Sequence, residues 1–338
     1  MAGRSDKGVT GLRGIARLAG VSTATVSRVI NNRPGVRTDL RRVVEQVIRE
    51  HGLHVDAAAR ALKSRKTWRF AVIAPPRGTL IFANPFFGEI LRGLTSVTEG
   101  AGYSLVMMTG ATSETLEEVN RNRSCDGVLL IGFRKGVPEA RSLKGATVPV
   151  VTIPRPGPRY RLPFVTVEDE VGAHEATLHL IRRGRRRIAL LSGPPTNIFT
   201  VNRLAGYRRA LRDAGLSFDP SLVVNGAYTF EGAYQATLQL LARERPPDAI
   251  FATSDYMATG VVDALRSRAT RIPEDIAVVG FGNAPISALI SPALTTVDEQ
   301  LQQLGAQAAA LLIGLAQGED VRDTQVALAS RLIVREST

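Results

Sequence analysis

The sequence predicts a small all-α unit at the N-terminus, followed by two α/β lobes that are each built on a doubly wound parallel sheet. Three observations support this fold class. The chain has 338 residues, more than the roughly 100–200 of one typical domain. Its excess positive charge lies in the first fifth of the sequence. Beyond residue 70, short apolar runs alternate with amphipathic stretches of helical spacing, as in βα units.

Composition narrows the class of protein. The formal net charge is +12, and residues 1–69 carry +10 of it. Such a segment either neutralises nucleic-acid phosphates or forms a solvated basic face. The single cysteine, Cys125, allows no disulfide within the chain, which suits a reducing compartment. The sequence has neither a signal-peptide pattern nor an apolar run near the roughly 18 residues of a membrane span. We therefore expect a cytoplasmic protein without membrane contact.

The N-terminal unit begins with two short helices and a tight turn. Gly20 can end the first helix in the left-handed conformation, and Ser22 can cap the second, which covers 23–30. A third helix starts near Thr38. The apolar faces of the first and third helices are Leu12, Ile15, Ala16 and Ala19, and Val43, Val44, Val47 and Ile48. This arrangement is typical of a helix-turn-helix, although the pattern alone also fits a generic three-helix bundle.

In a helix-turn-helix the second helix enters the major groove of DNA. Arg28 can read guanine bidentately, and Thr23 can bond base edges or touch a thymine methyl. The candidate base-contacting residues project from the exposed side of this helix: Thr23, Ala24, Ser27 and Arg28. The arginines better placed to hold phosphates are Arg17, Arg33, Arg37 and Arg42.

The remaining elements are expected to build the two lobes. Nearly continuous apolar runs predict buried parallel strands at 70–75, 103–108, 127–132, 149–153, 187–193, 249–254 and 276–282. Helical patterns lie between them, for example at 86–100, 170–183, 203–214, 231–243 and 255–268.

The stretch "IARLAGVSTATVSRVINNRPGV" (15–36) closely resembles the DNA-binding signature of the lactose-repressor (LacI/GalR) family. The segment "AAARALKS" (57–64) resembles the hinge helix of that family, in which a leucine matching Leu62 wedges into the minor groove and kinks the operator. The chain departs from the family at Val55-Asp56, where Pro-Asn is usual, and at Gly14, where a polar residue is common. These departures bear on how stably the hinge forms on DNA.

The resemblance continues through "LSGPP", "RLAGYRRAL", "IPEDIAVVGFG" and "SPALTTV". It implies the fold of periplasmic sugar-binding proteins, with three crossings between lobes near 163–168, 294–299 and 321–326, helix 301–316 in the first lobe and a last strand, 326–334, in the second. The implied domains are a helix-turn-helix unit (10–56), a hinge helix and linker (57–69) and an effector-binding and dimerisation domain (70–338). Within that domain the first lobe covers 70–165 and 298–323, and the second covers 166–297 and 324–338.

Ligands of such sheets bind outside the carboxyl ends of the strands. The resemblance places a small-molecule effector (a sugar, sugar acid or sugar phosphate) in the cleft between the lobes. The residues that match its effector site are Phe86, Phe87, Arg155, Arg203, Tyr228, Ser254, Asp255 and Asn283. Arg203 can form a forked pair of hydrogen bonds with a ligand, and Tyr228 can stack on a sugar face. Phe86 and Phe87 could instead be core residues.

Two departures concern the charge of this cleft. Gly282 stands where the family commonly has an aspartate, and Pro154 stands where it often has another. Losing two acidic acceptors while keeping Arg155 and Arg203 predicts a more basic cleft. On this ground we favour an acidic effector over a neutral hexose.

Two other classes of protein are less consistent with the sequence. An enzyme would need a catalytic motif, but no phosphate-binding loop is present and the four histidines (His51, His54, His174 and His179) lack metal-ligand spacing. We expect no catalytic residue, metal or cofactor. A transport-type sugar-binding protein would share the lobes, but it would need an export signal and no helix-turn-helix. The basic run 182–187 is interpreted as a solvated loop.

The function expected is that of a DNA-binding transcriptional regulator, a repressor controlled allosterically by a carbohydrate-like effector. Helix-turn-helix units read half-sites in pairs, so a homodimer should bind a pseudo-palindromic operator on double-stranded DNA. The resemblance places the dimer interface along both lobes.

Overall fold

A computed structural model of the chain describes residues 12–30, 34–50, 66–74, 82–109, 112–132, 146–156 and 160–338. The chain divides into two compact units, Met1–Trp68 and Arg69–Thr338. Each unit is described by itself.

The N-terminal unit contains three helices, α1 (Leu12–Leu18), α2 (Thr23–Ile30) and α3 (Thr38–Glu50). Their shared core is centred on Ile15, Val26 and Val44, which are fully buried. The predicted helices are therefore confirmed. One residue of the predicted apolar face is not part of this core: Val43 is 42% exposed, because the positions 44, 47 and 48 already fill the stripe that faces α1 and α2.

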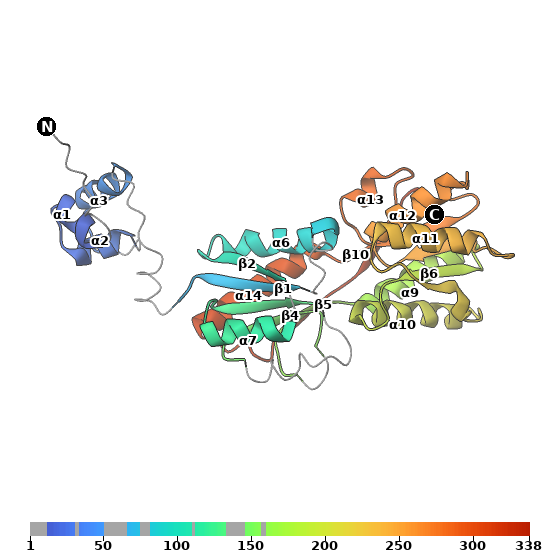
Figure 1. Cartoon of the computed structure of the whole chain (residues 1–338), viewed down its shortest axis with the longest axis horizontal. Helices are drawn as coiled ribbons and strands as arrows, with labels where there is room; N and C mark the ends of the chain where they lie inside the picture. Colours follow the sequence, from blue (N-terminus) through green and yellow to red (C-terminus); the bar gives the residue numbers. More distant parts are fainter. Residues whose placement is uncertain are drawn as a thin grey trace. The chain divides into compact units, whose positions relative to one another are not determined.

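The second unit contains two six-stranded sheets, each covered by helices on both faces (Figure 1). The first sheet has the order β11-β5-β4-β3-β1-β2, and its pairings are all parallel. Its strands are β1 (Arg69–Ala74), β2 (Ser104–Thr109), β3 (Gly127–Ile131), β4 (Val150–Ile153), β5 (Phe164–Val167) and β11 (Gln325–Leu328). Helix α7 (Thr112–Asn122) packs on one face, and α6 (Pro85–Thr98) and α14 (Leu301–Gln317) pack together on the other.

The second sheet repeats this topology in the order β12-β10-β9-β8-β6-β7. Its strands are β6 (Ile188–Ser192), β7 (Val223–Asn225), β8 (Ala249–Ala252), β9 (Ala277–Gly282), β10 (Thr295–Asp298) and β12 (Arg331–Ile333). Helices α9 (Asp169–Arg182) and α10 (Ile198–Asp213) cover one face, and α11 (Phe230–Leu241) and α12 (Asp255–Ser267) cover the other. The short helices η1 (Pro220–Leu222) and α13 (Ile286–Leu289) lie in connections.

The predicted pair of doubly wound lobes is therefore confirmed, with one difference in the last crossing. The sequence placed 324–338 and a single strand, 326–334, in the second lobe. In the structure, β11 pairs with β5 in the first sheet, and β12 pairs antiparallel to β10 in the second. The chain thus crosses at 329–330. Both strands are short edge strands with alternating or partial burial, so neither has the continuous apolar run that marks the inner strands.

Candidate DNA-reading surface and effector site

The turn between α1 and α2 is built by local backbone chemistry. Gly20 adopts a φ of +63°, a conformation that costs glycine nothing, and the Val21 amide donates to the Ala16 carbonyl at 3.0 Å. The Ser22 hydroxyl accepts a hydrogen bond from the Thr25 amide at 3.0 Å, which caps α2. Both predicted features of the turn are therefore confirmed.

Helix α2 turns one face to the core and the other to solvent. Val26 and Val29 are buried. Among the predicted base-contacting residues, Thr23, Ala24 and Arg28 are exposed and Ser27 is half-buried. The structure therefore brings these four residues together on the outer side of one short helix, as a major-groove reader requires.

Three of the four arginines predicted to contact phosphates belong to the described residues. Arg17 and Arg42 are exposed. Arg37 is also exposed, but its Nη2 lies 2.7 Å from Asp39 Oδ2, so a phosphate would have to displace that carboxylate. Arg33, Leu62 and the expected hinge helix 57–64 lie outside the described residues.

Two aromatic residues predicted for the effector site start helix α6. The Asn84 side chain caps the helix by accepting a hydrogen bond from the Phe86 amide at 3.1 Å. The rings of Phe86 and Phe87 meet edge-on at 5.2 Å, and the Phe86 ring also lies 5.6 Å from that of Phe199 in α10. Both side chains are only half-buried, so they are not ordinary core residues.

Arg155 follows β4 and is exposed. Its guanidinium carbon lies 5.6 Å from the centre of the Phe164 ring, a distance that allows a cation–π contact. The neighbouring Pro154 is buried. In this structure Arg155 is thus held against its own lobe.

The other predicted effector residues follow the carboxyl ends of strands in the second sheet. Tyr228 has a φ of +58° and lays its ring against Gly193, where a β-carbon would overlap the ring. Its hydroxyl lies 3.0 Å from the Thr200 hydroxyl. Because β6 and β8 flank the point at which strand order reverses, this is the edge where open α/β sheets bind ligands.

Arg203 is the most enclosed of the predicted residues, with 3% of its surface exposed. Its Nε donates to Asp169 Oδ1 at 2.7 Å, its Nη1 to the Thr253 carbonyl at 2.7 Å and its Nη2 to Glu299 Oε1 at 2.5 Å. The Phe281 ring lies 3.8 Å from the guanidinium carbon. The expectation of a basic site around Arg203 did not include these two buried acidic side chains, which occupy hydrogen-bonding positions of its guanidinium.

This cluster shifts the pKa of each member. Burial raises the pKa of Glu299 to about 8, and Asp169 and Asp255 add to the rise while Arg203 opposes it. Burial also raises the pKa of Asp169, against the pull of Arg203. Burial by itself would lower the pKa of Arg203, but Glu299 and Asp169 raise it. Arg203 therefore remains charged, and Glu299 takes up a proton at a higher pH than an exposed glutamate does.

Asp255 and Asn283 are held by neighbours within the second lobe. Asp255 accepts hydrogen bonds from the Thr296 hydroxyl at 2.5 Å and from the Ala284 amide at 2.8 Å, and burial raises its pKa to about 6. The Asn283 side chain accepts from Arg335 Nη2 at 2.8 Å. Ser254 is buried and precedes α12 without capping it through its side chain.

Sequence reasoning missed Asp169 and Glu299. Both directly follow a crossing: Asp169 begins α9 one residue after Glu168, and Glu299 follows β10. Acidic residues just beyond the carboxyl end of a strand are a usable signal. The patterns "VEDE" and "VDE" at these crossings would have supplied it.

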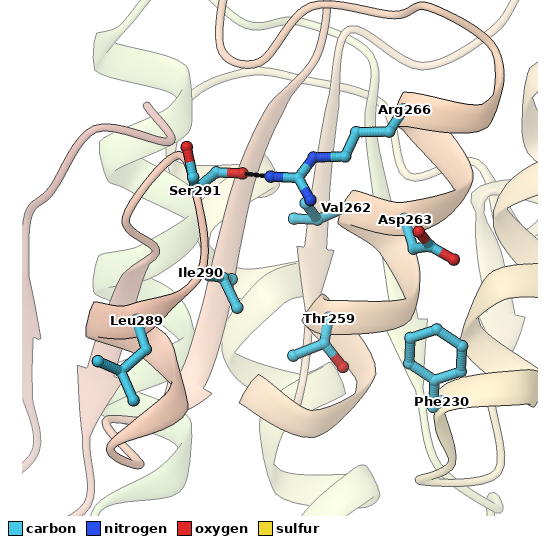
Figure 2. A pocket seen from close by; sticks show the side chains of 8 residues that line it. All are labelled: Phe230, Thr259, Val262, Asp263, Arg266, Leu289, Ile290 and Ser291. Atoms are coloured by element: carbon cyan, nitrogen blue, oxygen red, sulfur yellow. Dashed lines mark hydrogen bonds between the residues drawn. The ribbon is translucent and has the colours of Figure 1, made fainter.

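A separate pocket of about 460 Å³ opens on the second lobe, away from all the predicted effector residues. Figure 2 shows that it lies between α12 and the segment that includes α13, with Arg266 donating to the Ser291 carbonyl. Its lining residues are Phe230, Thr259, Val262, Asp263, Arg266, Leu289, Ile290 and Ser291. Leu289 is 78% exposed, which is unusual for a large apolar side chain.

Two other features are absent from the part of the chain that the structure describes. No group of three or more His, Cys, Asp or Glu residues there has the geometry of a metal site. No helix in the same ranges is long and apolar enough to span a membrane.

Comparison with known proteins places the chain in a family. Residues 11–56 match the family described as bacterial regulatory proteins, lacI family, and residues 177–338 match the periplasmic binding protein-like domain. The chain is 35% identical to the HTH-type transcriptional regulator CelR of Thermobifida fusca over 96% of both chains. It is 32% identical to the catabolite control protein A of Priestia megaterium, over 96% of this chain and 98% of the relative.

A solved structure shares the fold. The transcriptional regulator CelR in complex with cellobiose superposes with a TM-score of 0.75 and 33% identity, over 97% of this chain and 99% of that one. These relatives are regulators of transcription rather than enzymes. This chain belongs to the LacI family of bacterial regulatory proteins and is a DNA-binding transcriptional regulator.

Proposed function

We propose that the chain is a repressor that binds a pseudo-palindromic operator as a homodimer and changes its affinity for that operator when a sugar binds. In this scheme residues 10–56 read the DNA sequence. Residues 57–69 connect this unit to the rest of the chain, and their Leu62 kinks the DNA. Residues 70–338 bind the effector and form the dimer. A regulator that reads the bacterial chromosome works in the cytoplasm.

The observation that carries this proposal is the solvent face of α2. It presents Thr23, Ala24 and Arg28 on a helix whose opposite face is locked by Val26 and Val29. The excess positive charge of residues 1–69 supplies the attraction to phosphates. Arg17, Arg33 and Arg37 would set the register on the backbone, and α2 would read the bases.

A sugar is the effector class that we favour. The relative with 33% identity was solved with cellobiose. In this chain Tyr228, Phe86 and Phe87 offer aromatic faces, and polar groups such as Ser254 lie at the carboxyl ends of the second sheet. Binding there would bias the DNA-bound state, and linkage requires operator DNA to alter sugar affinity by the same factor.

The exposed Leu289 at the rim of the pocket in Figure 2 suits a contact between two copies of the chain. Contact with a partner would remove this apolar side chain from water. In the dimer, Leu289→Asp should shift the monomer–dimer equilibrium toward monomer, as measured by light scattering across a dilution series. Gln235→Asp, at an exposed polar residue of α11 in the second lobe, is the control, because it adds the same charge without removing an exposed apolar side chain. Equal dissociation constants for both variants and the wild type would remove Leu289 from the interface.

The repressor proposal is tested by selecting binding sites from a random DNA pool and titrating the selected duplex by fluorescence anisotropy. We expect an inverted repeat and a change of affinity when a sugar is added. A selected site without two-fold symmetry would contradict the dimeric reading of the operator. Failure of every sugar to alter operator affinity would contradict allosteric control.

A further inference from the structure

Position 282 adjoins Glu299 at the edge of the second sheet. Gly282 ends β9 with a φ of +133°, which side chains rarely adopt. A β-carbon there would lie 3.4 Å from Asp255 Oδ2 and 3.5 Å from Glu299 Oε2. A carboxylate on residue 282 would therefore be strained and would face two others. The acidic group that the family pattern places at 282 is supplied here by Glu299, from the crossing after β10.

The presence of Glu299 instead of an acidic residue at position 282 determines which carboxyl groups contact Arg203. Glu299 Oε1 accepts from Arg203 Nη2, while Asp169 holds Nε on the other edge of the guanidinium. The side chains of Arg203, Asp169 and Glu299 are 4%, 0% and 1% exposed, so water screens their charges poorly. Asp255 lies close enough to raise the pKa of Glu299, so a third carboxyl group adjoins the two that contact the guanidinium. An incoming anion would meet repulsion and would have to displace a carboxylate to reach Arg203.

The same cluster can still accept a hydrogen bond from a hydroxyl group of a ligand. Asp169 Oδ2 is buried without a hydrogen-bond partner among the described residues. Asn202 lies close enough to lower the pKa of Asp169, but no bond of normal geometry reaches that oxygen. A buried acceptor without a donor is costly, and a sugar hydroxyl would satisfy it.

We propose that Glu299 determines the charge class of the effector: in its ionised form it replaces the carboxylate of position 282, offsets the charge of Arg203 and favours uncharged polyhydroxyl ligands over sugar acids and sugar phosphates. This inference rests on the proposed sugar-regulated function. It reverses the expectation of an acidic effector that followed from the loss of an aspartate at position 282.

The test compares matched neutral and acidic probes on the full-length dimer at pH 9, where Glu299 is ionised because this pH lies above its pKa of about 8. The pairs are glucose and gluconate, cellobiose and cellobionate, and maltose and maltobionate, with affinity measured by calorimetry. We expect the wild type to bind a neutral member and to bind its acid at least about tenfold more weakly. Glu299→Gln keeps a side-chain oxygen for Arg203 but removes the charge, so the neutral-to-acid ratio should fall about tenfold.

Glu168→Gln is the matched control, because Glu168 is an exposed acid at another crossing and its loss removes the same charge. Its ratio should equal that of the wild type. If Glu299→Gln does not fold, the wild type measured at pH 6 and pH 9 replaces it. Ionisation of Glu299, in the field of Arg203, Asp169 and Asp255, should weaken acid binding further at the higher pH.

The outcomes separate this inference from the proposed function. A wild type that prefers the acids, or a ratio that Glu299→Gln and pH both leave unchanged, overturns the inference while sugar control of the operator stands. A panel in which no member binds or changes operator affinity contradicts the proposed function, and the inference with it.

Discussion

Arginine serves opposite purposes in the two units of this protein. Arg28 on α2 is exposed. Its contacts therefore depend on the ligand that binds, because an exposed guanidinium can bond to guanine or to phosphate. Arg203 on α10 is 3% exposed and engaged by Asp169, Thr253 and Glu299. The same type of side chain is thus exposed to an incoming ligand in one unit and organises a buried cluster in the other. Burial and the nearest carboxylates make the difference.

The largest expected effect comes from breaking the buried cluster. Arg203→Leu leaves Asp169 and Glu299 without their cation, which should cost about 3–5 kcal/mol of unfolding free energy. Arg209→Leu breaks an exposed pair with Glu170 between the same two helices and should cost no more than about 1 kcal/mol. Urea unfolding followed by circular dichroism measures both. Equal losses would show that burial does not separate the two arginines.

Substitution of the exposed arginines in the N-terminal unit should change the affinity for DNA but not the free energy of unfolding. Arg28→Ala removes a candidate guanine contact and should weaken binding to the selected operator by about 1–3 kcal/mol. Arg17→Ala should instead weaken all duplexes alike and reduce the salt dependence of log affinity by about one. Anisotropy titrations at several salt concentrations distinguish the two. Uniform loss for both variants would assign Arg28 to the phosphates.

The raised pKa values in the cluster predict a pH-dependent stability. A carboxyl group whose pKa is higher in the folded state keeps its proton on folding, so stability falls as pH rises from its unfolded toward its folded value. Glu299, with a pKa of about 8, should contribute a slope of at most about 1.4 kcal/mol per pH unit. Asp255, with a pKa of about 6, contributes at lower pH.

His179 acts in the opposite sense near its own pKa, which burial lowers. The interval between pH 7 and 8 spans the approach to the pKa of Glu299, and comparison with Glu299→Gln separates its share from that of Arg203, Asp169 and Asp255 around it. Urea midpoints across this interval should decline in the wild type and stay level in Glu299→Gln. A midpoint that rises with pH in the wild type would contradict the assignment.

The smallest expected effect concerns the cap of α2. Ser22→Ala removes the acceptor of the Thr25 amide and should destabilise the N-terminal unit by about 1 kcal/mol. Hydrogen exchange in the full chain should show faster opening of α2 and unchanged protection of the second unit. Unchanged exchange in α2 would mean that packing of Val26 and Val29 alone holds the helix.

The sequence determined the DNA-reading unit almost completely. The turn at Gly20, the cap at Ser22 and the outward face of α2 all follow from contacts within a few residues, and a helical period separates buried from exposed positions. The alternation of apolar runs and helices likewise predicted both sheets. Such features depend on local chemistry, so a single sequence is enough to predict them.

Only the tertiary structure decided the state of the effector site. Arg203 finds Asp169 and Glu299 at sequence separations of 34 and 96 residues, through crossings that no periodicity records. The sequence showed that position 282 lacks an aspartate, but only the fold showed that Glu299 lies beside that position. The assignment of β11 to the first sheet and β12 to the second likewise depends on long-range pairing. Charge balance in a buried site depends on which distant groups meet there, and that is a property of the packed chain.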